Sequence, residues 1–359
     1  MDEIKILVIN PGSTSTKIGV YLNIKAIFLK TINHSESELA KYNKIIDQLT
    51  FRKEIIIREI IKAEINLKKI QIIIGRGGLL KPIESGIYAI NERMKEDLKN
   101  AKYGEHASNL GALLADELAS ELKNNVKAYI ADPVVVDELE DVARISGNPE
   151  FTRKSIFHAL NHKAVAREYA KSIHKDYENL NLIVAHMGGG ISVGAHKKGR
   201  VIDVNQALDG EGPFSPERSG TLPAGDLAKY CFFKNKNYED IKKMITGKGG
   251  YVAYLGTNSA YEVSIMAKAG NEKAALIQYA MAYQISKEIG AMATVLNGMV
   301  DAIILTGGIA HIDAIVKIIK QMTSFIAPVI VLPGGNEMNA LAMNAYLASL
   351  NKITVKEYN

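Results

Sequence analysis

Two segments of this chain follow the same pattern: a buried strand, a tight turn of glycine and small hydroxyl residues, and a second strand. The first runs from Ile6 to Tyr21 as ILVINPGSTSTKIGVY, and the second from Leu182 to His196 as LIVAHMGGGISVGAH. Only small side chains let backbone N–H groups come close to a bound anion. The repeat therefore predicts two related domains that face one polyphosphate.

Length and composition agree with two soluble α/β domains. The chain has 359 residues, which is more than one core usually supports, and 47% of them are hydrophobic and 23% charged. A net charge of +5 raises the question of nucleic acid, but the basic residues alternate with acidic ones, as in residues 42–64. The sequence has no basic cluster with interleaved aromatic residues, so we expect no nucleic-acid partner.

Cysteine content and the N-terminal residues bear on the compartment. The single cysteine, Cys231, excludes an intrachain disulfide and a zinc site made of cysteines. Residues 1–10 carry two acidic residues and no basic region ahead of an apolar stretch, so no signal peptide is expected. The longest apolar runs are too short, or too interrupted by glycine, to span a bilayer. We expect a cytoplasmic protein that contacts no membrane.

Strands alternate with helices along the chain, which predicts a mainly parallel sheet with ligands at the carboxyl ends of its strands. Alternating or apolar runs predict strands at 5–10, 17–22, 25–33, 71–78 and 126–133. Helical spacing of apolar residues predicts helices at 36–64, 106–122 and 272–296, and a further one that starts near Ser155. Near the C-terminus, residues 300–322 and 329–350 each combine a strand, a diglycine turn and a helix.

The domain boundaries are expected near the Asn148-Pro149 turn and before the C-terminal helix. The N-terminal domain then comprises residues 1–150 with about 340–359 returning to it, and the C-terminal domain comprises 151–339. A loop rich in glycine and proline at 209–227 belongs to the second domain, and such loops on a rigid sheet often carry function.

The turn of the first hairpin has the composition of a phosphate site. Ser13, Ser15 and the local N–H groups can donate to phosphate oxygens, and Lys17 adds a positive charge on the next strand. The spacing of a Walker loop is absent. An ordinary hairpin turn with a surface lysine is the alternative interpretation, which the recurrence of the motif disfavours.

The second hairpin contains three consecutive glycines, Gly188, Gly189 and Gly190. A triplet of this kind weakens a strand, so close backbone approach to a β- or γ-phosphate is the expected use. Gly307 and Gly308 form a similar glycine-rich turn between a strand and a helix, where helix-terminal N–H groups could face a nucleotide. A close contact between helix and strand explains that diglycine equally well.

Eight motifs together resemble the butyrate kinases, in the order in which that family has them. They are NPGSTSTK (10–17), GRGG (75–78), ADP (131–133), FHALNH (157–162), AHMGGG (185–190), ERSGTLPAGD (217–226), TGGIAH (306–311) and PGGNE (333–337). That family lies in the acetate kinase group of the superfamily of sugar kinases, heat-shock ATPases and actin. The resemblance covers nearly the whole chain and implies ATP-dependent phosphorylation of a short-chain carboxylate, with an acyl phosphate and ADP as products.

The residues agree with that chemistry. Transfer of a γ-phosphoryl group to a carboxylate brings two anions together, so the site needs cations and aligned donors more than a base. Arg76, Arg218 and His158 are the candidates, and the planar fork of Arg218 fits a carboxylate or phosphoryl group. By the resemblance, Arg218 holds substrate and His158 donates to the transferring phosphoryl group. Arg76 departs from the acetate kinase pattern, where the arginine lies farther from the diglycine.

The remaining histidines receive different predictions. By the resemblance, His186 lies near the phosphate hairpin, with Asn10 also placed at the nucleotide. His158 and His162 have the i, i+4 spacing of a metal-binding helix but lack the glutamate of zinc proteases, so His162 is expected to make a structural hydrogen bond. His34, His174 and His196 are expected on the surface.

Magnesium needs oxygen ligands and usually keeps several waters, so one or two carboxylates suffice. Asp132, which ends a strand, and Glu337, which starts the last helix, are the candidates, and helix capping is the alternative role for Glu337. The resemblance favours both as metal ligands and lets Asn10 orient a metal-bound water. Asp132 is also expected to take part in catalysis.

We therefore expect an α/β protein with two duplicated ribonuclease-H-like domains, mixed sheets flanked by helices, and ATP in the cleft between them. ATP, ADP and Mg²⁺ are the expected cofactors, and a homo-oligomer is expected from the family. Acetate or propionate kinase is one alternative, although ADP at 131–133 and GRGG at 75–78 depart from the acetate kinase pattern and favour a roomier acyl pocket. A non-catalytic actin-like ATPase is the other, and the dense loop at 217–226 argues against it.

Overall fold

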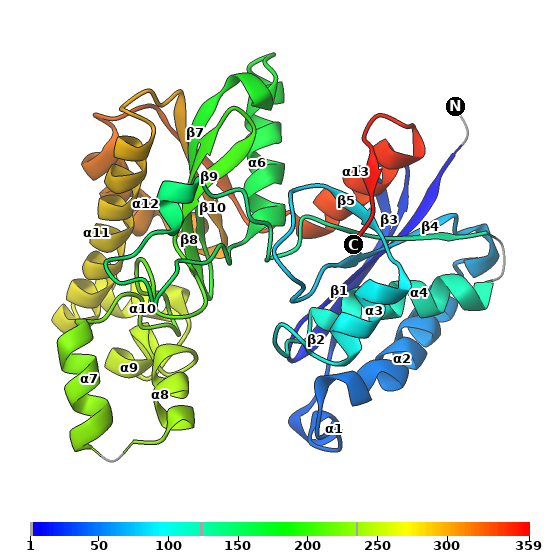
Figure 1. Cartoon of the computed structure of the whole chain (residues 1–359), viewed down its shortest axis with the longest axis horizontal. Helices are drawn as coiled ribbons and strands as arrows, with labels where there is room; N and C mark the ends of the chain where they lie inside the picture. Colours follow the sequence, from blue (N-terminus) through cyan, green and yellow to red (C-terminus); the bar gives the residue numbers. More distant parts are fainter. Residues whose placement is uncertain (1–2, 123–124, 235) are drawn as a thin grey trace. The chain divides into compact units, whose positions relative to one another are not determined.

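The computed structural model describes residues 3–122, 125–234 and 236–359. The chain forms two compact units: unit 1 comprises Met1–Val136 and Asn336–Asn359, and unit 2 comprises Asp137–Gly335. Figure 1 shows the sheet of each unit with helices packed beside it.

The boundaries of the units differ from the expected 150/151 and 339/340. Residues 137–150 belong to unit 2 because Glu138 is tied to it twice, by an ion pair with Lys163 and by accepting from the N–H of Val201. The N–H of Glu140 also donates to the carbonyl of Ile202. The turn at Asn148-Pro149 therefore lies inside unit 2.

A seven-stranded sheet forms the centre of unit 1, in the order β12-β5-β6-β4-β1-β2-β3. Its strands are β1 (Lys5–Pro11), β2 (Ser15–Leu22), β3 (Lys25–Asn33), β4 (Ile72–Arg76), β5 (Ile87–Ala89), β6 (Lys127–Ala131) and β12 (Val355–Lys356). Its helices are α1 (Glu36–Leu39), α2 (Leu49–Lys62), α3 (Glu92–Lys99), α4 (Asn109–Leu122) and α13 (Glu337–Ser349). Strands β1, β4 and β6 run parallel, so their carboxyl ends share one edge.

A five-stranded sheet forms the centre of unit 2, in the order β11-β10-β7-β8-β9. Its strands are β7 (Asn181–Met187), β8 (Ile191–Lys197), β9 (Arg200–Val204), β10 (Ala302–Gly307) and β11 (Val329–Pro333). Its helices are α5 (Asp141–Arg144), α6 (Ala159–Ser172), α7 (Ala224–Phe233), α8 (Tyr238–Ile245), α9 (Gly250–Leu255), α10 (Ala260–Lys268), α11 (Glu272–Val295) and α12 (Asp313–Thr323).

The two sheets share one topology. The order β6-β4-β1-β2-β3 in unit 1 repeats the order β11-β10-β7-β8-β9 in unit 2. In each, three antiparallel strands formed by a hairpin and its continuation are followed by two parallel ones. The duplication read from the two hairpin segments is therefore present in the fold, as expected of two ribonuclease-H-like cores.

Burial explains why the central strands are nearly continuous apolar runs. Residues 6–9 of β1 and 182–185 of β7 are fully buried, because helices pack on both faces of these strands. Each buried branched side chain contributes about 1.5–3 kcal/mol relative to an exposed one. These strands form a rigid base from which the polar residues at their carboxyl ends extend.

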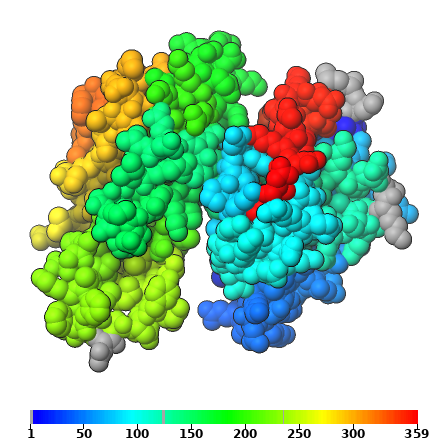
Figure 2. All heavy atoms as spheres, viewed as in Figure 1, coloured from blue at the N-terminus to red at the C-terminus, as the bar shows by residue number. Residues whose placement is uncertain are grey.

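The C-terminal segment completes unit 1. Helix α13 packs on β1 and β4, and the hydroxyl of Tyr21 donates to Asn339 of this helix. Strand β12 then pairs with β5 at the edge of the sheet. Figure 2 shows this segment in red against the cyan part of unit 1.

The helix predicted at 36–64 is wrong as a single element. It is divided into α1, a 3-10 turn at Ile45–Gln48, and α2. A capping box between Ser35 and Glu38 starts α1, and the N–H of Ile45 donates to the carboxylate of Glu105 on another segment. These polar contacts interrupt a segment whose apolar spacing alone indicated one helix.

Two helices, α4 and α6, begin later than predicted, and α4 starts at Asn109 rather than at 106. Helix α6 starts at Ala159 rather than near Ser155, because the carbonyl of Ile156 accepts from the N–H of Ala207 instead of entering a helix. The helix after the diglycine of β10 starts at Asp313, and a 3-10 turn at Gly308–His311 precedes it. Among the described helices, none combines the length and the hydrophobicity that a membrane span requires.

Candidate active site

The carboxyl ends of three parallel strands of unit 1 carry predicted site residues. Asn10 lies near the end of β1 and Arg76 at the end of β4, and Asp132 follows β6 directly. Pairing of Ile9 with Gly75 and of Arg76 with Ala131 places the three positions in register along this edge. The structure thus places residues far apart in the sequence along one edge of the sheet.

Asn10, Arg76 and Glu337 form a connected polar group. The amide of Asn10 donates to Oε2 of Glu337 at 2.6 Å, and Nη1 of Arg76 lies 3.4 Å from the same oxygen and 3.5 Å from Oδ1 of Asn10. The side chains of Arg76 and Glu337 are only 22% and 19% exposed, so this ion pair is shielded more than a surface pair. Glu337 is thereby held at the start of α13 by more than a capping role.

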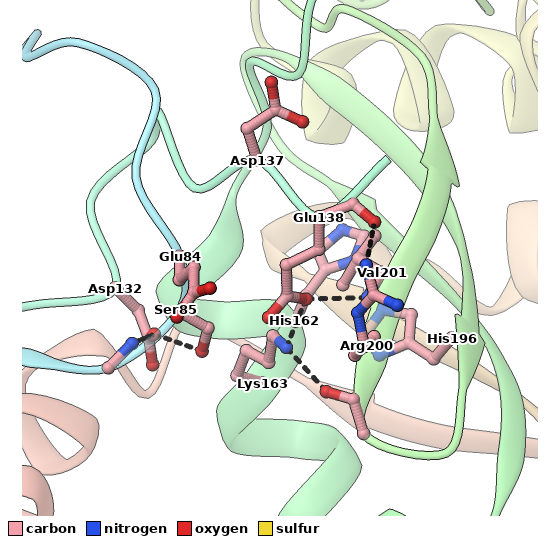
Figure 3. Close-up of polar contacts among 12 residues, drawn as sticks. Glu84, Ser85, Asp132, Asp137, Glu138, His162, Lys163, His196, Arg200 and Val201 are labelled. Carbon is pink, nitrogen blue, oxygen red and sulfur yellow. Dashed lines mark hydrogen bonds and ion pairs between the residues drawn. The ribbon is translucent and has the colours of Figure 1, made fainter. Parts of the chain in front are cut away.

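Asp132 is buried and adopts a left-handed backbone with φ of 39°. Its Oδ1 accepts from the hydroxyl of Ser85 at 2.6 Å and from the N–H of Gly86 at 2.8 Å. Figure 3 shows the contact with Ser85. These bonds anchor the loop that carries Ser85, and the catalytic and metal-binding roles of Asp132 stay predictions.

The turn of the first hairpin presents its polar side chains outward. Ser13 is exposed and Ser15 partly exposed. Lys17 is also exposed, and it is paired with Asn10 across β1 and β2, which puts the two side chains on the same face of the sheet. This arrangement fits the predicted binding of an anion.

Arg52 of α2 supports this turn from beneath, and the sequence analysis missed it. Its guanidinium is fully buried and donates to the carbonyls of Gly12, Ser13 and Ser15 at 2.8, 3.2 and 3.1 Å. It also bonds Oγ1 of Thr16 and Oε1 of Gln48. The negative ends of these peptide dipoles are thereby turned toward a cation inside the unit. Burial lowers the pKa of Arg52 to about 10, so it stays charged near neutral pH.

A signal for Arg52 was present in the sequence. Positions 49, 52, 56 and 60 share one helical stripe by their spacing, and the other three are Leu49, Ile56 and Ile60. An arginine on an apolar stripe needs partners for its N–H groups inside the protein. The carbonyls of a neighbouring turn are such partners.

The glycine triplet of unit 2 is backed by the loop that carries Arg218. A Cβ on Gly190 would lie 2.0 Å from Nη1 of Arg218, so only glycine leaves room for the guanidinium. The hydroxyl of Ser215 donates to the carbonyl of Gly189 and accepts from the N–H of Arg218. The predicted phosphate turn and the predicted catalytic arginine therefore pack directly against each other.

The side chain of Arg218 is largely buried but makes few hydrogen bonds to the protein. Its Nη1 donates to the carbonyl of Ala207 at 2.6 Å, while its Nε is buried without a partner. Burial lowers the pKa of Arg218 from its ordinary value, and the nearby charge of Glu217 counteracts this. An unsatisfied guanidinium N–H is costly unless a ligand or water meets it, so this group is suited to bind an anion.

His158 and His186 stack face to face in unit 2. Their ring centroids lie 3.9 Å apart with the planes inclined by 15°. Nδ1 of His186 bonds Oδ1 of Asn161 at 2.7 Å, and Nδ1 of His158 bonds the hydroxyl of Ser192 at 2.9 Å. A Cβ on Gly188 would lie 3.2 Å from Nε2 of His186, which places this nitrogen beside the glycine triplet.

Gly307, the last residue of β10, and Gly308, which follows it, have different surroundings. Gly307 has φ of 88°, and a Cβ there would lie 2.2 Å from the carbonyl oxygen of Met187, so the fold itself requires glycine. A Cβ on Gly308 would meet open space. The close strand contact thus explains Gly307, and nucleotide binding at both positions stays a prediction.

Two of the three histidines expected on the surface are buried, so that prediction was wrong for His34 and His196. His34 bonds Oγ1 of Thr16 at 2.8 Å, beneath the first hairpin. His196 lies between Tyr177 and His162, with bonds of 2.7 and 3.2 Å. Hydrogen bonds to polar neighbours allow these two histidines to be buried, and the spacing of residues in the sequence does not reveal those neighbours. His174 is exposed as expected, and His162 makes the expected hydrogen bonds.

Known proteins resemble this chain over its full length. It is 55% identical to butyrate kinase 1 of Clostridium acetobutylicum over 354 residues, which is 99% of each chain. Butyrate kinase 2 of the same organism is 54% identical over the same share.

Solved structures show the same fold at low identity. The acetate kinase of Porphyromonas gingivalis superposes with a TM-score of 0.77 at 18% identity, covering 96% of this chain and all of that one. A propionate kinase of Francisella tularensis superposes with a TM-score of 0.74 at 20% identity, covering 95% and 98%. Residues 147–328 also match the acetokinase family. Together with the identity to the two butyrate kinases, this shows that the chain belongs to the acetokinase family.

Proposed function

We propose that the chain phosphorylates butyrate, or a branched carboxylate of similar size, with ATP to give an acyl phosphate and ADP. The observation that carries this proposal is the 55% identity to butyrate kinase 1 across 99% of both chains. Acetate and propionate kinases share the fold at 18% and 20% identity, which supports a related reaction but not their substrates.

The reaction is an in-line transfer. A carboxylate oxygen forms a bond to the γ-phosphorus while the bond from that phosphorus to the β–γ bridging oxygen breaks, and the electron pair stays on ADP. No base is required, since the carboxylate is already ionised near neutral pH. Catalysis then depends on positioning and on neutralising charge at the phosphoryl oxygens.

The residues of unit 2 supply most of the required donors. Arg218 would bind phosphoryl or carboxylate oxygens with the N–H groups that the protein leaves unsatisfied. His158 would donate to the phosphoryl oxygens, and the glycine triplet beside Nε2 of His186 would meet the β- and γ-phosphates. Gly308, whose Cβ position is open, would take the nucleotide near the end of β10.

The residues of unit 1 would hold the other charges. Arg76 supplies a further cation, and Ser13, Ser15 and Lys17 contribute exposed donors at the first hairpin. The carboxylate of Glu337, with the side-chain amide of Asn10 bonded to it, fits Mg²⁺, since this ion binds through one or two carboxylates and several waters. Among the described residues no cluster of three or more histidine, cysteine, aspartate or glutamate side chains that could hold a metal occurs. When bound, Mg²⁺ would neutralise phosphate charge.

The test is an assay with ATP, Mg²⁺ and a series of acids from acetate to valerate, including isobutyrate, with the acyl phosphate trapped as hydroxamate. The expected result is the highest kcat/KM with butyrate or a branched acid. A maximum at acetate or propionate would support the alternative carboxylate kinases. ATP hydrolysis without hydroxamate from any acid would refute the kinase proposal in favour of an actin-like ATPase.

Assembly and compartment are further proposals. A homo-oligomer is supported by the side chains of Phe232 and Phe233, which are 82% and 83% exposed, and by exposed tyrosines on the helices of unit 2 such as Tyr261. A cytoplasmic location is proposed from the single cysteine of the sequence. Light scattering of the purified protein tests the oligomer, and a monomer at assay concentration would refute it.

A further inference from the structure

Five polar side chains of unit 2 form a continuous hydrogen-bonded chain that ends at His158. Nδ1 of His158 and Nε2 of His162 each lie 2.9 Å from the hydroxyl of Ser192. Nδ1 of His162 then lies 3.2 Å from Nε2 of His196, and Nδ1 of His196 lies 2.7 Å from the hydroxyl of Tyr177. Ser192, His162 and His196 are fully buried and Tyr177 is 3% exposed.

We propose that Ser192, His162, His196 and Tyr177 act as a one-way hydrogen-bond relay that keeps His158 neutral, with its proton on Nε2. They are positioning residues for the phosphoryl transfer, so their catalytic effect rests on the proposed function. The relay itself is a property of the free protein.

The two inner histidines are neutral. Complete burial lowers the pKa of His162 well below its ordinary value, and the charges of His186 on β7 and of Lys163 lower it further. A hydrogen bond with the backbone of Ser192 acts in the opposite direction but does not outweigh them. Burial likewise lowers the pKa of His196, and His162, Lys163 and Arg167 of α6 add to this. A neutral imidazole carries one proton, so each ring donates from one nitrogen and accepts at the other.

Tyr177 sets the direction of the relay. A phenol hydroxyl donates readily to an imidazole nitrogen, and the short distance of 2.7 Å fits an O–H donor. Lys163 and Arg167 lie 5.7 and 5.9 Å from the centroid of the Tyr177 ring. Positive charge over the ring draws electron density from the phenol oxygen, which makes it a better donor and a poorer acceptor.

Every later step follows from that first donation. Because His196 accepts at Nδ1, its proton is on Nε2 and is donated to Nδ1 of His162. His162 then carries its proton on Nε2 and donates it to Ser192, whose own hydroxyl proton is left for Nδ1 of His158. A neutral His158 that accepts at Nδ1 carries its proton on Nε2, where it can donate to a phosphoryl oxygen.

The charge of Lys163, beside the relay, is paired with that of Glu138. Lys163 is 1% exposed at its side chain and forms an ion pair with Glu138 at 2.7 Å, and its Nζ also donates to the carbonyl of Gly199. Figure 3 shows Lys163 and Glu138 beside His162 and His196. Stacking of His186 on His158 further disfavours a charge on both rings.

The direct test is nitrogen NMR of free protein labelled at its eight histidines, with assignment by single substitution. Long-range couplings from the ring carbon protons tell a protonated nitrogen from a bare one. We expect His158, His162 and His196 to be protonated at Nε2 only. A proton on Nδ1 of any of the three, or on both nitrogens of His162 or His196 near neutral pH, would overturn the relay.

Ser192→Ala cuts the relay next to His158. We expect a mixture of His158 tautomers, a kcat about tenfold lower with the KM for ATP nearly unchanged, and a dependence of kcat on pH that the wild type lacks, because His158 loses the donor that keeps it neutral. Ser286→Ala is the matched control, because Ser286 is also buried and its hydroxyl donates to the carbonyl of Ala282 within its own helix, away from the relay. An unchanged His158 tautomer and pH profile in Ser192→Ala would show a purely structural network.

Tyr177→Phe covers the case in which Ser192→Ala does not fold, since it removes only a hydroxyl at the far end. The nitrogen shifts should change most at His196 and detectably at His158, two histidines farther along the chain. A change confined to His196 would overturn the relay. Because these spectra need no substrate, they stand even if no carboxylate is phosphorylated, which separates failure of the relay from failure of the proposed function.

Discussion

The turn of the first hairpin packs on the guanidinium of Arg52, whereas the glycine triplet of the second packs on that of Arg218. Arg52 uses all three of its nitrogens, with bonds to three carbonyls of the turn, to Thr16 and to Gln48. Arg218 has a bond from Nη1 to Ala207 and a buried Nε without a partner. The same residue type thus braces both hairpins, but its hydrogen-bonding capacity is used up in only one of them.

This difference separates a structural arginine from a functional one. A fully bonded guanidinium fixes the shape of a turn and has nothing left for a ligand, while an enclosed guanidinium with free N–H capacity gains bonds when an anion arrives. We therefore expect Arg218 to govern kcat and Arg52 to govern stability and the shape of the first turn.

Arg218→Ala is the strongest test of this contrast. Loss of the main cation at the transferring group should lower kcat by about 10³-fold, with the melting temperature little changed, because the side chain makes few protein bonds. Steady-state kinetics and thermal melting measure both. Arg58→Ala on the exposed face of α2 is the control and should keep the wild-type kcat. Near-normal turnover in Arg218→Ala would remove this residue from the reaction.

Gly190→Ala tests the packing of Arg218 on the triplet. A Cβ would lie 2.0 Å from Nη1, so the guanidinium must move, and a displacement of about 1 Å can cost about 10²-fold in kcat. Gly290→Ala, in a helix with open space at its Cβ, should leave kcat unchanged. If Gly190→Ala also keeps its activity, the position of Arg218 in the free protein is not the one used in catalysis.

Arg52→Met replaces the other arginine with an apolar side chain. Three carbonyls of the turn lose a charged donor inside the protein, which should lower the free energy of unfolding by about 3–5 kcal/mol and raise the KM for ATP. Urea unfolding and ATP titration measure these effects. Lys53→Met is the matched control, since the partly exposed ion pairs of Lys53 should contribute below about 1 kcal/mol. An unchanged KM would mean that the turn does not shape the nucleotide site.

The features predicted correctly from the sequence are local patterns of strands and turns. The paired hairpins predicted the duplicated sheets, and strand ends predicted the shared edge of Asn10, Arg76 and Asp132. These predictions succeeded because strand periodicity and glycine-rich turns are local, and because parallel strands collect their carboxyl ends in one place. The pairing of Arg76 with Glu337, from distant parts of the chain, was not visible in the sequence.

Buried polar residues were harder to predict. His34 and His196 were expected on the surface because a lone histidine has no local pattern, and their partners Thr16 and Tyr177 become neighbours only in the fold. Arg52 was missed for the same reason, although its place on an apolar stripe was a usable signal. Helix starts moved where a carbonyl found a partner in another segment, as at Ile156.

The two units should also differ in how their stability depends on pH, although this effect is smaller than those of the arginine substitutions. Burial lowers the pKa of His162 and His196 in unit 2 and of His34 in unit 1. Such a histidine takes up its proton only in the unfolded chain as the pH falls below ~6.5, so its contribution to stability is present above that pH and is lost below it. Each such histidine lowers the free energy of unfolding by up to about 1.4 kcal/mol for every unit by which the pH falls. Unit 2, with two such histidines, should therefore lose stability more steeply than unit 1.

Hydrogen exchange resolved by peptide, corrected for intrinsic rates, can follow both units above and below pH ~6.5. Burial raises the pKa of Glu288 in unit 2, which works in the opposite sense because the folded carboxyl binds its proton first, so Glu288→Gln should make the decline of unit 2 steeper. His162→Asn should flatten that decline, while His174→Asn, at an exposed position, should leave it unchanged. Equal pH dependence of the two units in the Glu288→Gln background would show that His162 and His196 are not held neutral, and the relay to His158 would lose its basis.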